Sequence, residues 1–208
     1  MTTPQGPAYR IETERLVVRC YRPGDAPLLQ VAIEESVEHL RPWMPWIDEE
    51  PKTLAQRVTL LRRFRGQFDL DQDYIYGIFN RDETRLWGGT GLHTRRGEGV
   101  REIGYWIHAD QVRRGLVTES TAALIRVAFE VEQVVRVEIR CDPENVASAA
   151  IPRKLAFTHE GVLRHETEFL GKRRDTSVWG LLVADYPGSP AAAAPLKAFD
   201  VLGQPLLS

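Results

Sequence analysis

The chain has 208 residues, of which 43% are hydrophobic and 27% are charged, and its formal net charge is −2 at pH 7. A chain of this length and composition can bury the core of one soluble globular domain. The weakly negative charge gives no reason to expect nucleic-acid binding, and no apolar run reaches the roughly 18 residues of a membrane span.

The first part of the chain predicts a strand followed by two helices. The segment from Leu16 to Arg19 is short, β-branched and flanked by charges, which is typical of a strand. Apolar residues at helical spacing predict a helix from Ala26 to about Val37. Thr53 is placed to cap a second helix, in which apolar residues recur every three or four positions as far as Phe68.

The middle of the chain changes to a period of two, which predicts strands over Tyr74 to Phe79, Leu86 to Leu92 and Glu102 to His108. The third strand has Ile103, Tyr105 and Ile107 on one face and Glu102, Gly104, Trp106 and His108 on the other. A helix from Thr118 to Glu130 and a strand from Val134 to Arg140 are expected next.

The remaining elements complete an α+β fold. Asn145 opens a short helix that must bend or stop near Pro152. An antiparallel pair is expected from Phe157 to Thr167 and from Arg174 to Ala184. The sum is a mixed, mostly antiparallel sheet with helices on both faces.

The end of the chain differs in composition from the rest. Residues 187–195 are rich in proline and alanine, and the following tail to Leu207 is apolar again. We therefore expect one domain over residues 1–186 and a linker with an apolar tail over 187–208. Such a tail must pack on its own domain or on a second copy of the chain.

The segment Gln111-Val-Arg-Arg-Gly-Leu-Val-Thr-Glu-Ser120 joins the third middle strand to the helix that follows it. The first N–H groups of a helix have no intrahelical partner, and the helix dipole favours an anion there. Arg113 and Arg114 add positive charge, and Gly115 permits a close ligand approach that a side chain could forbid. The segment predicts a pyrophosphate site.

Four stretches stand in a characteristic order: Glu12–Arg19, His39–Trp46, Glu102–Ile107 with Arg113–Glu119, and Asn145–Ser148 with Lys154–Phe157. In this order they resemble the GNAT superfamily of acyl-CoA-dependent N-acyltransferases. Within it, the chain is similar to the branch of RimJ/RimL-type ribosomal-protein-alanine N-acetyltransferases. The resemblance covers residues 9 to about 185 and implies a sheet that is splayed at its centre. The chain departs from the family pattern at Val112, Val117 and Ala156.

The resemblance implies that acetyl-CoA is the donor. The residues expected to hold its pyrophosphate are Arg113, Arg114, Gly115, Leu116, Val117 and Thr118. Its pantetheine arm is expected to pair with the strand end at Trp106, Ile107 and His108, and Asn145 is expected to hydrogen-bond that arm.

An amine attacks a thioester only when it is neutral, so the enzyme must accept one proton and supply another to the leaving thiolate. Ser148 is the candidate general acid, and Glu102 is the candidate base, acting through a water. The structural alternatives are that Asn145 merely caps the helix that contains Ser148 and that Glu102 pairs with a nearby arginine. Glu102 is also placed to bind a cationic amine, and His108 is an alternative base.

The loop with two tryptophans is the candidate acceptor entrance. Trp43, Met44 and Trp46 are expected to line it, and Arg41 is expected to meet an acceptor carboxylate or carbonyl. The alternative is a loop that is tucked into the core.

No metal is expected, since the histidines show no ligand spacing. Cys20 and Cys141 lie far apart, fit no metal or redox motif and are expected on strands as small core residues. Because neither cysteine falls in the motif region, direct attack in a ternary complex is favoured over a covalent acyl-enzyme.

The predicted activity is acetyl transfer from acetyl-CoA to a primary amine, and the resemblance favours the N-terminal α-amine of a protein or peptide. A small-molecule amine and a succinyl-CoA donor are the enzymatic alternatives, and a non-catalytic acyl-CoA sensor is another. The N-terminus lacks the basic start and apolar segment of a secretory signal, so we expect a cytoplasmic location. A homodimer through the apolar tail is expected, with no nucleic-acid or membrane partner.

Overall fold

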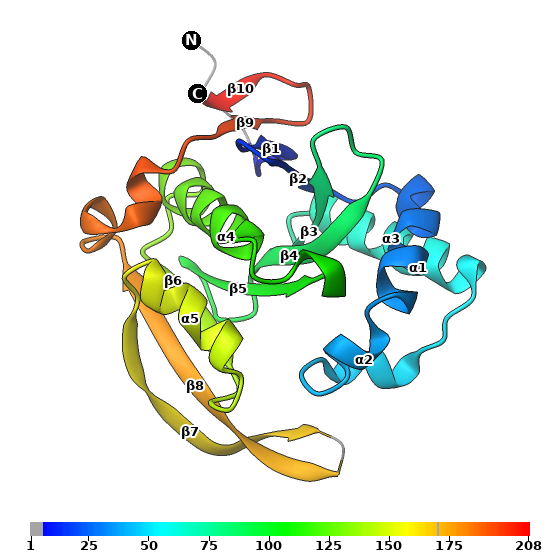
Figure 1. The fold of residues 1–208 in the computed structure, drawn as a ribbon. Helices are drawn as coiled ribbons and strands as arrows, with labels where there is room; N and C mark the ends of the chain where they lie inside the picture. The colour runs from blue at the N-terminus through cyan, green and yellow to red at the C-terminus, as the bar shows by residue number, and fades with distance from the viewer. Residues whose placement is uncertain (1–5, 170) are drawn as a thin grey trace.

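The computed structural model describes residues 6–169 and 171–208 (Figure 1). Residues 1–5, on which the expectation of no secretory signal partly rests, lie outside the described range. The fold is built on one sheet of ten strands in the order β10-β9-β1-β2-β3-β4-β5-β6-β8-β7. The β5–β6 pair is parallel and the other pairs are antiparallel, which confirms the predicted mixed sheet.

The strands are β1 (Arg10–Glu12), β2 (Leu16–Cys20), β3 (Tyr74–Asn80), β4 (Leu86–His93), β5 (Val100–Ile107), β6 (Arg136–Cys141), β7 (Thr158–Phe169), β8 (Lys172–Leu182), β9 (Lys197–Phe199) and β10 (Pro205–Leu207). The helices are α1 (Ala26–Glu34), α2 (Val37–Leu40), α3 (Leu54–Asp69), α4 (Leu116–Arg126), continued by a π-helical turn (Val127–Val131), and α5 (Val146–Lys154). Short 3₁₀ turns precede α1, α3 and α4 and connect β8 to β9.

One predicted helix is divided for an identifiable reason, whereas α3 and α5 begin where the sequence predicted. The helix expected from Ala26 to Val37 is divided at Ser36, which leaves the helical conformation and accepts a hydrogen bond from the Ala109 N–H at 3.1 Å. The α3 helix begins as predicted, because Thr53 and Gln56 form a reciprocal capping box. Pro152 lies inside α5, and the helix continues past it to Lys154.

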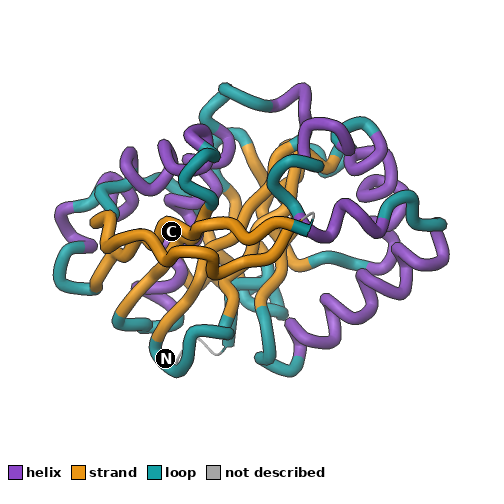
Figure 2. The backbone as a smooth tube through the Cα atoms, turned by 90° about the horizontal axis from the view of Figure 1, so that it is seen from below, coloured by secondary structure: helices purple, strands orange, loops and turns teal. Residues whose placement is uncertain are grey.

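Helices cover both faces of the sheet, as the alternating strands predicted (Figure 2). On one face, α4 and α5 bury Leu124 and Ala149 against strand residues such as Ile139. On the other face, α1 and α3 bury Leu29 and Leu61 in a second core. The two cores hold the central strands from both sides.

The central pair of strands separates along its length. The β5–β6 pairing runs from Val100 opposite Arg136 to Ile103 opposite Ile139. Beyond that point β5 continues to Ile107 and β6 to Cys141 without pairing to each other. The predicted splay is therefore present, and it leaves backbone groups of β5 facing the gap.

The C-terminal tail joins the sheet of its own chain. Strand β9 pairs with β1, and β10 pairs with β9 at the outer edge (Figure 1). Leu196 and Ala198 are buried there. Of the two packing modes expected for the tail, the structure has the one within the chain. None of the helices in the described residues is long and apolar enough to cross a bilayer.

Candidate active site

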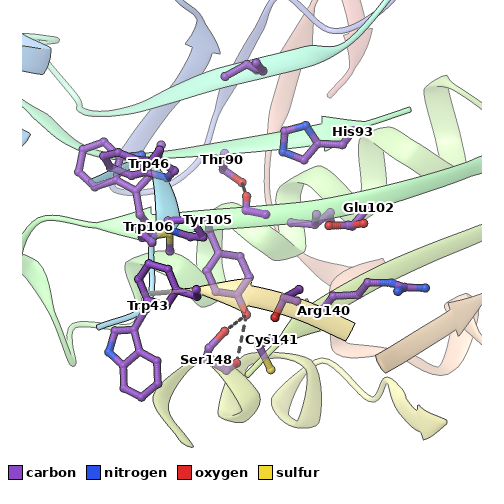
Figure 3. Close-up of a pocket in the computed structure, with 18 of the residues that line it drawn as sticks. Trp43, Trp46, Thr90, His93, Glu102, Tyr105, Trp106, Arg140, Cys141 and Ser148 are labelled. Atoms are coloured by element: carbon purple, nitrogen blue, oxygen red, sulfur yellow. Dashed lines mark hydrogen bonds between the residues drawn. The ribbon is translucent and has the colours of Figure 1, made fainter. Parts of the chain in front are cut away.

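A cavity of about 850 Å³ lies at the point where β5 and β6 separate (Figure 3). Tyr105 and Trp106 of β5, Cys141 of β6 and Ser148 of α5 line it. Gly89 and Gly104 form part of its wall, and a side chain at Gly89 would collide with Trp106 Nε1, only 2.4 Å from the added Cβ. Because these sheet positions are glycines, the cavity reaches down to the backbone of β4 and β5.

Ser148 and Tyr105 form the polar centre of this cavity (Figure 3). The Ser148 hydroxyl donates to the Tyr105 oxygen at 3.2 Å, and the Tyr105 hydroxyl donates to the backbone oxygen of Ser148 at 3.0 Å. In a regular helix that backbone oxygen would accept the N–H four residues later, but Pro152 has no N–H. The proline therefore leaves an acceptor for Tyr105, and burial raises the pKa of the Tyr105 phenol well above its usual range.

Asn145 caps α5, which the sequence analysis gave as the alternative to a hydrogen bond with the pantetheine arm. Its side-chain oxygen accepts the Ser148 N–H at 3.0 Å and so opens α5. Asn145 also lines the cavity. The cap fixes the first turn of α5, and with it the position of the Ser148 hydroxyl.

Glu102 is buried at one end of the cavity between two arginines. Arg95 and Arg96 both donate to its carboxylate, the latter at 2.5 Å. Burial opposes the charge on Glu102, but the two guanidinium groups outweigh it and lower the pKa of the carboxyl. A carboxylate with a lowered pKa holds a proton less readily than an unpaired glutamate does.

The loop after α2 forms an aromatic wall of the cavity through Trp43, Met44 and Trp46. Trp46 meets Trp106 edge to face, with ring centroids 6.1 Å apart. Arg174 of β8 ties the loop down, because it donates to the Pro42 backbone oxygen at 3.1 Å and to Asp142 at 2.9 Å.

Arg41 lies apart from this wall. It is not among the residues that line the cavity, and its exposed guanidinium lies 3.4 Å from Glu38 and 3.8 Å from Asp48. The structure therefore brings three of the four predicted acceptor-side residues together at the cavity.

The predicted pyrophosphate site is an exposed helix start. Gly115 has φ +78° and precedes the first turn of α4, where Leu116, Val117 and Thr118 carry N–H groups without intrahelical acceptors. The exposed Arg113 and Arg114 flank it. Arg15, in the turn between β1 and β2, supports this helix start, because it donates to the Arg114 backbone oxygen at 2.8 Å. The charge, the backbone geometry and the position beside the splayed strand all suit the phosphates of acetyl-CoA.

His108 follows β5 and is held on both sides of its ring. Its Nε2 lies 2.9 Å from the Glu35 carboxylate, and its Nδ1 accepts the Asp110 N–H at 3.1 Å. Its backbone N–H donates to Trp87. With both ring nitrogens engaged, His108 serves to fix the end of the strand beside Ile107.

Several residues that line the cavity were missed in the sequence analysis, and Tyr105, Cys141 and His93 are the chemically important ones among them. Tyr105 was assigned to the apolar face of its strand, and its hydroxyl finds Ser148 only because β6 and α5 return beside β5. Cys141 lines the cavity instead of lying in the closed core, and burial raises the pKa of its thiol. His93 lines the cavity with its Nδ1 2.9 Å from Asp73. Asp73 comes beside His93 because Tyr74 pairs with Leu92 across the β3–β4 hairpin, a register that the sequence analysis did not predict.

Comparisons with known proteins identify the family of the chain. Residues 15–158 match the family model described as an acetyltransferase (GNAT) domain. The ribosomal protein uS5-alanine N-acetyltransferase of Escherichia coli (strain K12) is 28% identical over 188 residues, which cover 88% of this chain and 95% of that protein.

Solved structures of acetyltransferases share the fold. The microcin C7 self-immunity acetyltransferase MccE, in complex with acetyl-CoA and AMP, has a TM-score of 0.76 at 20% identity and covers 82% of this chain and 93% of its own. RimL, the ribosomal L7/L12 α-N-protein acetyltransferase in complex with coenzyme A, has a TM-score of 0.74 at 18% identity and covers 82% and 95%. These structures share the fold, and the match to the family model spans more than half of the chain, so the chain belongs to the GNAT family of N-acetyltransferases.

Proposed function

We propose that this enzyme transfers the acetyl group of acetyl-CoA to the N-terminal α-amine of a protein or peptide, by direct attack in a ternary complex. The observation that carries the proposal is the Tyr105–Ser148 pair beside the splay of β5 and β6. The similarity to the uS5-alanine N-acetyltransferase supports an α-amine as the acceptor.

The donor would lie along the gap between β5 and β6. Its pyrophosphate would meet the α4 start at Gly115 with Arg113 and Arg114, and its pantetheine arm would run past Trp106 and Ile107. Ser148, held by Asn145 and Tyr105, would deliver a proton to the departing thiolate. Such a hydroxyl would act as a relay, because its own pKa is too high for it to titrate at neutral pH.

The acceptor would enter between the aromatic loop and the β7–β8 hairpin. Trp43 and Trp46 give a rigid apolar wall at low entropic cost. The tie from Arg174 to Pro42 would hold the wall in place as the acceptor binds. Arg41 would contact only the part of an acceptor that remains outside the cavity.

Glu102 would order the rim of the cavity. The two guanidinium groups of Arg95 and Arg96 converge on its carboxylate and would lose their common anchor without it. We therefore propose that Glu102 positions these two arginines and is not the base. The Glu102→Gln variant tests this assignment.

The test is acetyl-CoA turnover, read as release of free thiol, with peptides that bear different N-terminal residues and with a panel of small amines. Wild-type protein is compared with Ser148→Ala. Turnover on peptides that falls about 100-fold in the variant is the expected result, since a positioned proton donor contributes about that factor or more.

Other outcomes separate the alternatives. Turnover on small amines alone would assign a small-molecule acceptor. Turnover with succinyl-CoA in preference to acetyl-CoA would reassign the donor. Tight binding of coenzyme A without any turnover would contradict the proposal and favour the sensor.

A further inference from the structure

His93 stands at the end of β4 with its ring held by a carboxylate. Its Nδ1 lies 2.9 Å and 3.1 Å from the two carboxylate oxygens of Asp73, a residue of the loop between α3 and β3. The Asp73 carboxylate also accepts the Thr94 N–H at 3.4 Å and is thereby oriented. The side chain of His93 is 17% exposed, so the ring is largely enclosed but reachable.

The other ring nitrogen faces the cavity. The imidazole lies over β4 and β5 among the lining residues (Figure 3). A Cβ added at Gly91 would sit 2.8 Å from Nε2, and one added at Gly104 would sit 3.3 Å from it. These two glycines therefore make the space that the ring occupies. Among the residues that the structure describes, Nε2 has no hydrogen-bond partner.

This arrangement determines the tautomer. A carboxylate on Nδ1 accepts a hydrogen bond, so in the neutral ring the proton resides on Nδ1 and Nε2 presents a lone pair. A general base needs such a lone pair within reach of the reacting group, directly or through one water.

The other candidate bases lack this property. Both ring nitrogens of His108 are engaged, by Glu35 and by the Asp110 N–H. The carboxylate of Glu102 is neutralised by two arginines, which lower its pKa. By its geometry, His93 is thus the cavity group best arranged to accept a proton.

We propose that His93 is the general base of this enzyme and that Asp73 is its positioning residue. The inference rests on the acetyl transfer proposed above and adds the proton acceptor that transfer requires. The acceptor amine arrives as an ammonium ion, and Nε2 takes one of its protons through a water.

The acetyl group is then transferred to the neutral amine. The neutral nitrogen attacks the thioester carbon, so that a C–N bond forms and the carbonyl electron pair moves to oxygen. When the carbonyl re-forms, the C–S bond breaks and its electron pair leaves on sulfur. A second proton leaves the nitrogen and reaches the thiolate by way of the Ser148 hydroxyl. The third stays on the amide, and His93 releases its proton to solvent.

Four charged groups surround the ring: Asp73 below Nδ1, Glu102 on the neighbouring strand, and the arginines Arg95 and Arg96 that pair with Glu102. A general base acts only when it is unprotonated, so the wild-type pH profile of kcat/KM should show an acidic limb that depends on the presence of His93. Replacement of Asp73 by asparagine removes a negative charge that favours the imidazolium ion, so that limb should move to lower pH.

The experiment measures kcat, both KM values and the pH profile of kcat/KM for wild type, His93→Gln, His93→Ala and Asp73→Asn. His159→Gln is the matched control, because His159 is exposed and does not line the cavity. We expect kcat to fall about 100-fold in both His93 variants with the KM for acetyl-CoA unchanged. Added imidazole should restore turnover to His93→Ala and leave the wild-type rate unaltered.

The pH profile separates the enzyme group from the acceptor. The acceptor amine contributes its own acidic limb in every variant, whereas the limb of His93 should disappear in His93→Gln and shift in Asp73→Asn.

A wild type that turns over amines, together with a His93→Gln variant within twofold of it, would overturn the inference and leave the proposed function standing. A wild type that turns over no amine overturns both. Asp73→Asn, which keeps the ring and the shape of its partner, decides the matter if the His93 variants fail to fold. If the acidic limb of the kcat/KM profile does not move in Asp73→Asn and kcat does not fall, the inference is wrong.

Discussion

At the scale of single residues, a missing N–H arranges the proposed proton donor. Pro152 deprives the Ser148 backbone oxygen of its helical partner, and Tyr105 fills the vacancy with its hydroxyl. The same hydroxyl then accepts the Ser148 Oγ–H. A proline that would ordinarily weaken a helix thus links α5 to β5 at the reacting centre.

Tyr105→Phe should reduce kcat about tenfold and leave the KM for acetyl-CoA unchanged. The variant removes both hydrogen bonds between Tyr105 and Ser148. At about 0.7 kcal/mol each they contribute about 1.4 kcal/mol together, and a loss of that size is a factor of ten. Tyr74→Phe is the matched control, since Tyr74 also bonds a side chain through its hydroxyl, to Asp71, but does not line the cavity. Equal kcat values for the two variants would contradict the role of Tyr105.

Glu102→Gln should lower the free energy of unfolding by about 2 kcal/mol at pH 7. Removal of one partner of a buried pair costs more than this, but the exposed Arg95 is partly screened by water. Glu138→Gln is the control, because that buried carboxylate also lies between two arginines, Arg136 and Arg140, but does not line the cavity.

The difference in the free energy of unfolding between wild type and Glu102→Gln should depend on pH. The folded-state pKa of Glu102 is lowered, so its contribution is complete above the unfolded value of about 4.3 and is lost as the pH falls through the folded value. Denaturant unfolding of wild type and Glu102→Gln should therefore differ equally at pH 7 and pH 5 and converge below about pH 4. A fall in turnover of more than about 100-fold beyond that of the Glu138 control would assign the base role to Glu102, whereas a smaller loss fits a positioning residue.

At the scale of elements, the start of α4 combines three separate contributions. The left-handed conformation of Gly115 turns the chain into the helix, Arg15 fixes the turn at Arg114, and Glu119 accepts from both Arg15 and Thr13. The proposed phosphate site is thereby anchored to the turn between β1 and β2, far away in the sequence.

Gly115→Ala should raise the KM for acetyl-CoA several-fold and change kcat little. An alanine at φ +78° is strained by about 1 kcal/mol, although its Cβ would meet no atom closer than 3.6 Å, so the cost falls on the backbone of the turn. Gly203→Ala carries a similar strain at φ +75° in the β9–β10 turn. An equal KM in the two variants would exclude the α4 start as the phosphate site.

At the scale of the whole molecule, the tail extends the sheet beyond the region that the family model matches. Strands β9 and β10 shield β1, which would otherwise be an edge strand. The boundary at residue 186 and the homodimer stay predictions. The tail still exposes Val201 and Leu202 at its turn, with 79% of Leu202 accessible, and these residues are an apolar contact that it can offer to a second copy.

Deletion of residues 196–208 should destabilise the protein by about 3 kcal/mol, or lower Tm by about 10 °C, because Leu196 and Ala198 lose their burial and β1 loses a partner strand. Thermal unfolding by circular dichroism measures the change. Leu202→Ser serves as the control, since it should leave Tm unaltered and reduce any self-association seen by gel filtration. An unchanged Tm after the deletion would support the domain boundary at 186.

The sequence by itself determined the longer helices, the strands β2 to β8, the mixed sheet and the glycine turn before α4, but not the short strands β1, β9 and β10 or the break between α1 and α2. Each feature that it determined follows from local patterns: periods of two and of about three and a half, a capping threonine at Thr53, and a glycine at Gly115 before a helix. The family resemblance added Ser148, whose spacing from Asn145 is also local.

Only the tertiary structure decided which side chains meet. Tyr105 and Ser148 are 43 positions apart and come together because α5 returns beside the splayed strand. Glu102 lies between Arg95 and Arg96 because the loop after β4 folds back over β5, and His93 meets Asp73 across a hairpin. Protonation and hydrogen bonding depend on distance and burial. The period of a sequence does not encode either quantity, so the roles of these groups could be assigned only from the tertiary structure.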